Sequence, residues 1–422
     1  MPRKPQRRWD EADLIRRVLR VLGAARRVLE LVCSRKTSPE LQDAAGLMDA
    51  KIVAETAMLL LCLDPIVSLD ARLREQSQQL AELLIPHARG DDVLAAMCLD
   101  PGSALDHGVA HIILGRLGYP DRDVDELLQN SLNLGPQFGP ERLPHRRLER
   151  AWLTRVWAHP GFPASSDSRP LAESALGRSM DALGASRLDI YAFTHAVMYA
   201  SDLGVRQVKA PRSRSAIAAD AEAALSSSLE TGDYDLTAEL LLTLTMLNLP
   251  WSATTNFAFK ILADAEDRLG FLPGGACDLA QYHTLTGATQ QSRFALTTSY
   301  HTIYVMGFLC ATALLPGRTP WAAVHERPAL RGSAATLQRL VNHDQLKACW
   351  REAFELLDAA QRDAVSPLLL TIVMRQATAS GNVALLRQAL EIALTYDLVR
   401  LPAVTQGLAL LRRSQLLKPK SH

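Results

Sequence analysis

Aromatic residues are scarce in this chain of 422 residues, because Phe, Trp and Tyr together make up only 5% of it. No convincing segment alternates apolar and polar residues over the length of a strand. Ala, Leu and Arg dominate instead, and these residues favour helix over sheet. The composition therefore predicts an all-α protein.

Cys-x-x-Cys pairs are absent, although the chain has six cysteines. Most of them fall in apolar helical patterns, which favours reduced, buried thiols in a cytoplasmic protein. Long hydrophobic runs are missing as well: the longest, residues 303–315, contains only 13 residues. That run is too short to cross a bilayer, so no transmembrane segment is expected.

Several nucleotide-binding and catalytic motifs are also missing. The chain has no Gly-x-x-x-x-Gly-Lys-Ser/Thr phosphate loop, no Gly-x-Gly-x-x-Gly dinucleotide turn and no Gly-x-Ser-x-Gly nucleophile elbow. No nucleotide cofactor is therefore indicated. The net charge is +1, and its basic excess is confined to residues 1–36. A nearly neutral body with one basic arm is not typical of a nucleic-acid-binding protein, so no nucleic-acid partner is expected.

Helical periodicity divides the chain into four regions. These are a basic arm with an amphipathic helix (1–36), an N-terminal helical region (37–160), a central helical region (170–316) and the C-terminal helices (333–415). Short connections that contain Gly or Pro are typical of antiparallel neighbours. We expect one continuous array of antiparallel helix pairs, either an open solenoid or a closed α/α toroid.

The first region carries arginines between its apolar positions. Leu14, Val18 and Leu22 recur at helical spacing, with Arg16, Arg17 and other arginines among them. A basic amphipathic helix can bind an anionic membrane or an acidic partner. More commonly its charges form a face exposed to solvent.

Two histidines stand four residues apart in an apolar setting. His107 and His111 would project from the same helix face, which is a common half-site for zinc and also suits copper or iron. Gly108 stands where metalloproteases place their general-base Glu, so that mechanism is not supported. The alternative is that both are ordinary core histidines.

A Tyr-His-Thr triplet occurs twice, at residues 282–284 and 300–302. In one unbroken helix, their histidines would lie about 27 Å apart, too far to share a ligand. Gly287 and the polar residues around it favour a fold-back between two helices, 277–286 and 293–315.

The surroundings of His195 resemble those of His111. Leu-Gly follows each within a few residues, at 203–204 and 117–118, which indicates the same position in successive helical hairpins. In a toroid, such positions point to one central cavity. The predicted metal ligands are His107, His111, His195, His283 and His301. Each one taken alone also fits a satisfied core position.

An acidic residue within a run of leucines is a further candidate. Glu239 would be costly to bury as a charge, so burial would raise its pKa, whereas a metal or Arg293 would lower it. An outward-facing, exposed Glu239 is the alternative. Asp233 or Asp235 is expected to cap the start of this helix.

The preferred hypothesis is a cytosolic enzyme that modifies a small molecule or a peptide in a helix-lined cavity, with zinc, copper or iron as a potential metal. Its catalytic residues would be His195, Glu239, His301 and Asp235, and its substrate-binding residues would be Tyr191, Tyr282, Tyr300 and Arg293. The alternative is a helical-repeat scaffold that binds a peptide or protein without catalysis. Either protein could form a homo-oligomer.

Overall fold

The computed structural model describes residues 9–37, 49–134, 141–162, 168–320, 330–342 and 348–416. Within these ranges the regular structure consists of 21 α-helices and three short 3-10 helices, without a strand. The all-α prediction is thereby confirmed. Residues 1–8 of the predicted basic arm lie outside the described ranges.

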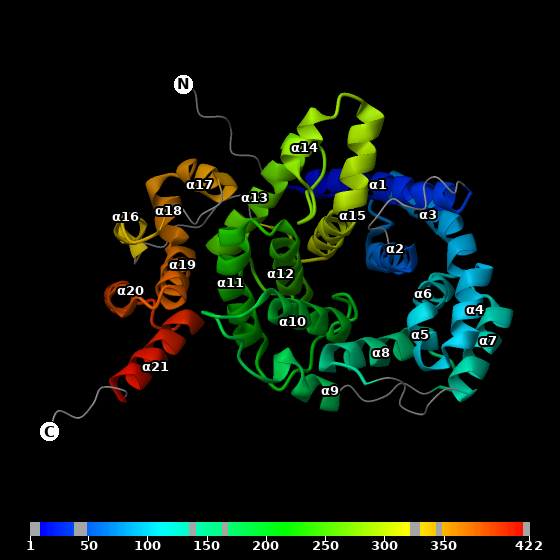
Figure 1. The fold of residues 1–422 in the computed structure, drawn as a ribbon, viewed down its shortest axis with the longest axis horizontal. Helices are drawn as coiled ribbons and strands as arrows, with labels where there is room; N and C mark the ends of the chain where they lie inside the picture. Colours follow the sequence, from blue (N-terminus) through cyan, green and yellow to red (C-terminus); the bar gives the residue numbers. More distant parts are fainter. Residues whose placement is uncertain are drawn as a thin grey trace.

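Six helices follow one another around the centre of the molecule (Figure 1). They are α2 (Asp49–Leu63), α6 (Val109–Arg116), α8 (Pro144–Trp157), α10 (Arg187–Ala200), α12 (Tyr234–Met246) and α15 (Ala288–Ala313). Each of them contacts the next, and α15 contacts α2 again. The first and last helices of this series are therefore neighbours in space.

Most of the other helices in the first three quarters of the chain pack outside this cycle (Figure 1). They are α1 (Glu11–Thr37), α3 (Ala71–Ala88), α4 (Asp91–Leu99), α5 (Ala104–His107), α7 (Arg122–Leu134), α9 (Ser168–Glu173), α11 (Arg214–Thr231), α13 (Ala253–Leu269) and α14 (Leu279–Thr284). Helix α1 packs on α15, and α11 and α13 pack on α12. Helix α5 leads directly into α6 and is separated from it only by Gly108.

The C-terminal helices lie to one side of the cycle, in orange and red in Figure 1. They are α16 (Ser333–Gln338), α17 (Ala348–Glu355), α18 (Ala359–Ala364), α19 (Ser366–Ala379), α20 (Val383–Thr395) and α21 (Pro402–Leu416). Helix α19 packs on α11, and α17 packs on α13. No helix in the described ranges combines the length and the apolar character required to cross a bilayer.

Local sequence fixes where the helices of the candidate site begin. Ser186 and Asp189 form a capping box at the start of α10, which satisfies backbone N–H groups that have no partner within the helix. Asp233 caps α12 by accepting a hydrogen bond from the Leu236 backbone N–H at 3.0 Å. The cap of α12 is thus Asp233 and not Asp235, whose side chain is free to point elsewhere.

Helix α1 does not expose all of its arginines. The side chain of Arg17 is completely buried, and its three nitrogens contact the carboxylates of Asp13, Glu266 and Asp267. Two of these carboxylates belong to α13, so the acidic partner of this helix lies within the same chain. The expectation of a purely solvent-exposed basic face is wrong for Arg17.

Candidate functional site

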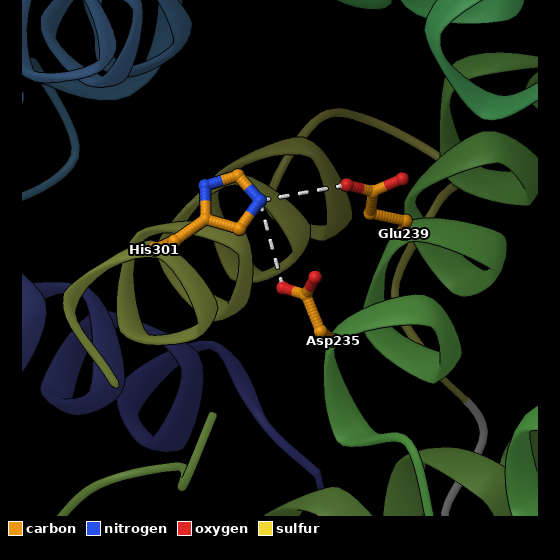
Figure 2. Close-up of side chains that lie close together, drawn as sticks. All are labelled: Asp235, Glu239 and His301. Carbon is orange, nitrogen blue, oxygen red and sulfur yellow. Dashed lines mark ion pairs between the residues drawn. The ribbon is translucent and has the colours of Figure 1, made fainter. Parts of the chain in front are cut away.

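Three side chains from two helices converge between α12 and α15 (Figure 2). Asp235 and Glu239 stand one turn apart on α12 and face His301 of α15. His301 Nε2 lies 3.6 Å from Asp235 Oδ1 and 3.7 Å from Glu239 Oε1. His195 Nε2 of α10 lies 3.7 Å from the same oxygen of Glu239. All four predicted catalytic residues therefore lie in one cluster.

Hydroxyl groups hold the two carboxylates of this cluster in place. Tyr191 donates a hydrogen bond to Asp235 Oδ2 at 2.5 Å, and Thr302 donates to Oδ1 at 3.2 Å. Thr194 donates to Glu239 Oε2, also at 2.5 Å. Glu239 Oε1, in contrast, is buried and has no hydrogen-bond partner. Unpaired buried polar atoms are rare and costly, which marks this oxygen as unusual.

His301 is fixed in the same one-sided way. Its Nδ1 lies 3.0 Å from Glu55 of α2, at hydrogen-bonding distance. Its Nε2 is buried and has no hydrogen-bond partner. The contacts of 3.6 and 3.7 Å to Asp235 and Glu239 are too long to serve as hydrogen bonds. Nε2 and Glu239 Oε1 thus face each other as an ion pair at 3.7 Å, and neither atom has a hydrogen-bond partner.

The electrostatics of the cluster follow from burial and from close opposite charges. Burial raises the pKa of Asp235, and the nearby charge of Glu239 raises it further. For Glu239, burial is outweighed by His195 and His301, so its pKa is lowered. Burial alone would lower the pKa of His301, but Glu239 and Glu55 raise it well above its ordinary value. The cluster therefore favours the charged forms of Glu239 and His301 despite their burial, and it disfavours the charged form of Asp235.

A pocket of about 560 Å³ opens beside the cluster and is lined by Asp235, His301, Tyr191 and Tyr300. The pocket also reaches residues at the beginning of helices α2, α10 and α12. These residues are Lys51, Arg187 and Asp233. The opening therefore lies on the side of the cycle where these helices begin.

Gly274 lets a turn lie directly against α15 at this pocket. A Cβ atom at Gly274 would come within 2.7 Å of the Thr298 carbonyl oxygen and 3.1 Å of Thr302 Oγ1. Any side chain here would push the turn away from the helix that carries His301. At the neighbouring Gly275, a Cβ atom would meet no other atom within 4 Å, so this position carries no such constraint.

The pair His107 and His111 does not form the predicted metal half-site. Helix α5 ends at His107 and α6 begins after Gly108, so the two histidines do not share one regular helix face. His111 is buried between Arg89, whose Nε donates to Nδ1, and Asp125, which lies 3.1 Å from Nε2. Both ring nitrogens are thus occupied. His111 is a satisfied core histidine, and burial lowers its pKa.

The chain does fold back at Gly287, because α14 ends at Thr284 and α15 begins at Ala288. As a consequence, His283 is exposed on α14 and lies apart from the cluster. Tyr282 lines a different pocket, of about 200 Å³, between α1 and α15. Arg293 is exposed and does not line the pocket beside His301.

Three residues of the site were missed in the sequence. Glu55 stands among apolar residues of α2, which is the same signal that singled out Glu239. Thr194 directly precedes His195 and had no distinguishing pattern. Arg187 is the first residue of α10, and its Nη2 lies 3.5 Å from Asp235 Oδ2. Arg187 lines the pocket beside His301, whereas Arg293 does not.

The sequence matches a family whose description is a domain of unknown function, DUF6895, over residues 15–311. The matched segment begins within α1 and ends within α15, so it contains five helices of the cycle, most of α15 and the whole cluster. Helices α16 to α21 follow it. No curated protein and no solved structure matches the chain.

Proposed function

The chain belongs to the DUF6895 family, and we propose that it is an enzyme that modifies a small molecule or peptide in a helix-lined cavity, using a metal ion bound by Asp235, Glu239 and His301. One observation carries this proposal. Glu239 Oε1 and His301 Nε2 are both buried, both lack a hydrogen-bond partner, and both face the same point beside Asp235.

The distances between the donor atoms suit a metal ion better than they suit hydrogen bonds. The ligand atoms of Asp235, Glu239 and His301 lie within 4.8 Å of one another, and His301 Nε2 is 3.6 to 3.7 Å from each carboxylate. Nitrogen and oxygen donors around a tetrahedral metal, each about 2.1 Å from it, are about 3.4 Å apart. A contraction of a few tenths of an ångström would therefore bring His301 Nε2 to the separation expected from each of the two carboxylates.

The partners behind the donors are those that metal sites require. A metal-bound histidine generally donates its second ring N–H to a carboxylate, which fixes its tautomer and orientation. Glu55 stands at that position, 3.0 Å from His301 Nδ1. Tyr191 and Thr194 restrain the two carboxylates in the same way.

Two carboxylates and one imidazole, without a thiolate, are donors that suit zinc or iron more than copper in its soft, monovalent state. A bound ion would act as a Lewis acid toward a substrate oxygen. The chain itself supplies groups that orient substrate and move protons. His195 lies beside Glu239 with part of its ring exposed and is placed to exchange a proton, while Tyr191 and Tyr300 line the pocket where substrate would lie.

The cyclic order of the inner helices supports a closed α/α toroid as the architecture. Helices α2, α6, α8, α10, α12 and α15 contact one another in sequence and return to the start. A closed cycle gives side chains from distant parts of the chain a common interior. In an open solenoid the ends of the array, here α2 and α15, would lie far apart.

The proposal is tested by the metal content of the full chain, purified without a histidine tag or chelator. We expect close to one equivalent of metal in the wild type and in His283→Ala, an exposed histidine outside the cluster. Glu239→Gln and His301→Ala should each lose most of it. Folding of every variant is checked by circular dichroism.

A folded wild-type protein that takes up no zinc, iron or copper on addition would contradict the metal site. So would metal that persists unchanged in both cluster variants. The remaining interpretation would then be a helical scaffold that binds a peptide without catalysis.

A further inference from the structure

A second pocket adjoins the one beside the proposed metal site. It has a volume of about 790 Å³, whereas the first pocket, which Asp235 and His301 line, has about 560 Å³. Residues that line both pockets form the boundary between them. They are Arg187, Asp233, Gly274 and Gly275. A ligand that reaches the cluster can therefore extend across this boundary into the second pocket.

Neighbouring residues of the chain line opposite sides of this boundary. At the start of α12, Asp235 lines the first pocket and Tyr234 lines the second. The turn that follows Pro273 is closed by the Cys277 N–H, which donates to the Gly274 carbonyl at 3.0 Å. In this turn, Ala276 lines the first pocket and Cys277 lines the second. The two pockets therefore meet at the start of α12 and at the turn, as parts of one cleft.

Gly275 lies in this turn and keeps the boundary open. No atom lies within 4 Å of the position that a Cβ atom would take at Gly275. The residue is exposed, and its backbone N–H and carbonyl form no hydrogen bond within the described ranges. Such backbone groups are available to pair with the main chain of a ligand.

The lining of the second pocket indicates an uncharged occupant. Its charged residues already have partners: Arg187 Nε donates to Asp233 at 2.8 Å, and Asp278 accepts from a backbone N–H at the start of α14 at 2.9 Å. The other lining residues are uncharged, among them Ile190, Leu236, Pro273 and Leu279. An uncharged, mainly apolar side chain therefore fits this pocket best.

We propose that the substrate is a peptide, bound in extended form, with its reacting group at the metal site and an uncharged side chain in the second pocket. This inference rests on the proposed function and narrows its substrate class to peptides. An exposed turn between two pockets suits an extended chain, because Gly275 can bind the peptide backbone while the pockets receive its side chains. Each pocket alone falls in the range of about 300–1,000 Å³ that is typical of small-molecule sites, so a compact small molecule would leave one of them empty.

Two hydroxamates of different length test this proposal on the zinc-loaded full chain. Acetohydroxamate binds a metal ion and occupies only the first pocket, whereas N-acetyl-leucyl-leucyl-glycine hydroxamate extends about 10 Å further and crosses the boundary. In titration calorimetry, we expect the wild type to bind the longer compound about tenfold or more tightly, as burial of one leucine side chain predicts. Ala280→Trp, which fills part of the second pocket, should remove most of this difference and leave acetohydroxamate binding unchanged.

Ala384→Trp is the matched control. Ala384, like Ala280, is an exposed alanine at the second position of its helix. It lies on α20 and lines neither pocket, so this variant should bind both hydroxamates as the wild type does. Circular dichroism checks the folding of each variant.

Equal affinity of the wild type for the two hydroxamates would overturn the proposal, and so would a preference for the longer compound that persists in Ala280→Trp. Zinc content, measured on the same samples, reports on the metal site separately. If the chain binds no zinc, the methylamide of the same peptide, which needs no metal, is titrated instead. Binding that the wild type shows and Ala280→Trp loses would then refute the metal site and leave the peptide site standing, whereas absence of binding would refute both.

Discussion

The protein buries two clusters of charge that differ in how they are paired. In the first, between α1 and α13, Arg17 uses all three guanidinium nitrogens to contact Asp13, Glu266 and Asp267. In the second, between α12 and α15, Glu239 Oε1 and His301 Nε2 remain without hydrogen-bond partners. Both clusters are buried, so burial alone does not identify a functional site. What separates them is the distance within the ion pairs: Arg17 lies 3.0 Å from Asp13 and from Asp267, whereas His301 Nε2 lies 3.6 Å from Asp235 and 3.7 Å from Glu239.

The comparison gives each cluster a different role. A fully paired buried cation fixes the packing of two helices, because separating it from its carboxylates would leave charges uncompensated. A cluster with buried polar atoms that lack hydrogen-bond partners can bind a ligand. Until the ligand is bound, these atoms lower the stability of the folded protein. Substitutions in the first cluster should therefore lower stability and leave ligand binding unchanged. Substitutions in the second cluster should instead remove ligand binding.

The largest effect is expected from Arg17→Met. Removal of the guanidinium leaves three acidic groups near one another in a buried site, and the free energy of unfolding should fall by about 3–5 kcal/mol. Urea denaturation measures this loss. Arg26→Met, which breaks the exposed pair with Glu30, serves as control and should cost less than about 1 kcal/mol. Similar losses in both variants would remove the structural role assigned to the first cluster.

The second effect is stabilisation by metal. With zinc or iron at about 100 times its dissociation constant, the free energy of unfolding should rise by about 2.7 kcal/mol. Glu239→Gln should abolish this gain, whereas Asp267→Asn, in the paired cluster, should retain it. The measurement is a pair of denaturation curves with and without metal. Retention of the gain in Glu239→Gln would place the ion elsewhere.

A smaller effect tests how the turn at Gly274 packs on α15, beside the cluster between α12 and α15. Gly274→Ala forces a Cβ atom against the Thr298 carbonyl and should cost about 1–3 kcal/mol. Gly275→Ala has open space around it and should be neutral or slightly stabilising. Urea denaturation of the two single variants measures the difference between their free energies of unfolding. Equal stabilities would show that the turn can leave α15 freely.

The smallest effect concerns pH. Burial, together with the charge of His195, lowers the pKa of His145 to about 4 from an ordinary value of 6.5. Between these values the unfolded chain takes up a proton that the folded chain does not, so stability falls as the pH drops from 6.5 to 4. Because His145 is half-exposed, we expect a contribution of about 1 kcal/mol.

His145→Gln should remove this contribution from the pH dependence of the unfolding free energy, measured by urea denaturation from pH 7 to pH 4. His283→Gln, which replaces an exposed histidine, is the control. An unchanged slope in His145→Gln would show that the folded protein accepts a proton at this position as readily as the unfolded chain does.

Local patterns were sufficient to predict the helices and part of the cluster. The apolar periodicity predicted an all-α chain, and Gly287 predicted the break that separates His283 from His301. Glu239 was recognised as an acidic residue in an apolar helix, and it is indeed buried. These features depend on residues within a few turns of one another, so the sequence alone reveals them.

The partners across the cycle could not be predicted in this way. Glu55 and His301 are 246 positions apart, and Arg17 and Glu266 are 249 apart. No local pattern specifies which helix faces which over such distances. The choice of Arg293 failed for a simpler reason: it precedes His301 by eight residues, which is about 12 Å along the helix. His111 failed because Arg89 and Asp125 already occupy its ring.

The contact between α2 and α15 also has a consequence for synthesis of the chain. Glu55 leaves the ribosome 246 residues before His301, a delay of about 12–50 s at typical rates of translation. During that interval the apolar face of α2 has no α15 to cover it and depends on other segments or on chaperones. A nascent chain arrested before α15 therefore contains most of the described helices but lacks the contact between α2 and α15 and the imidazole of His301.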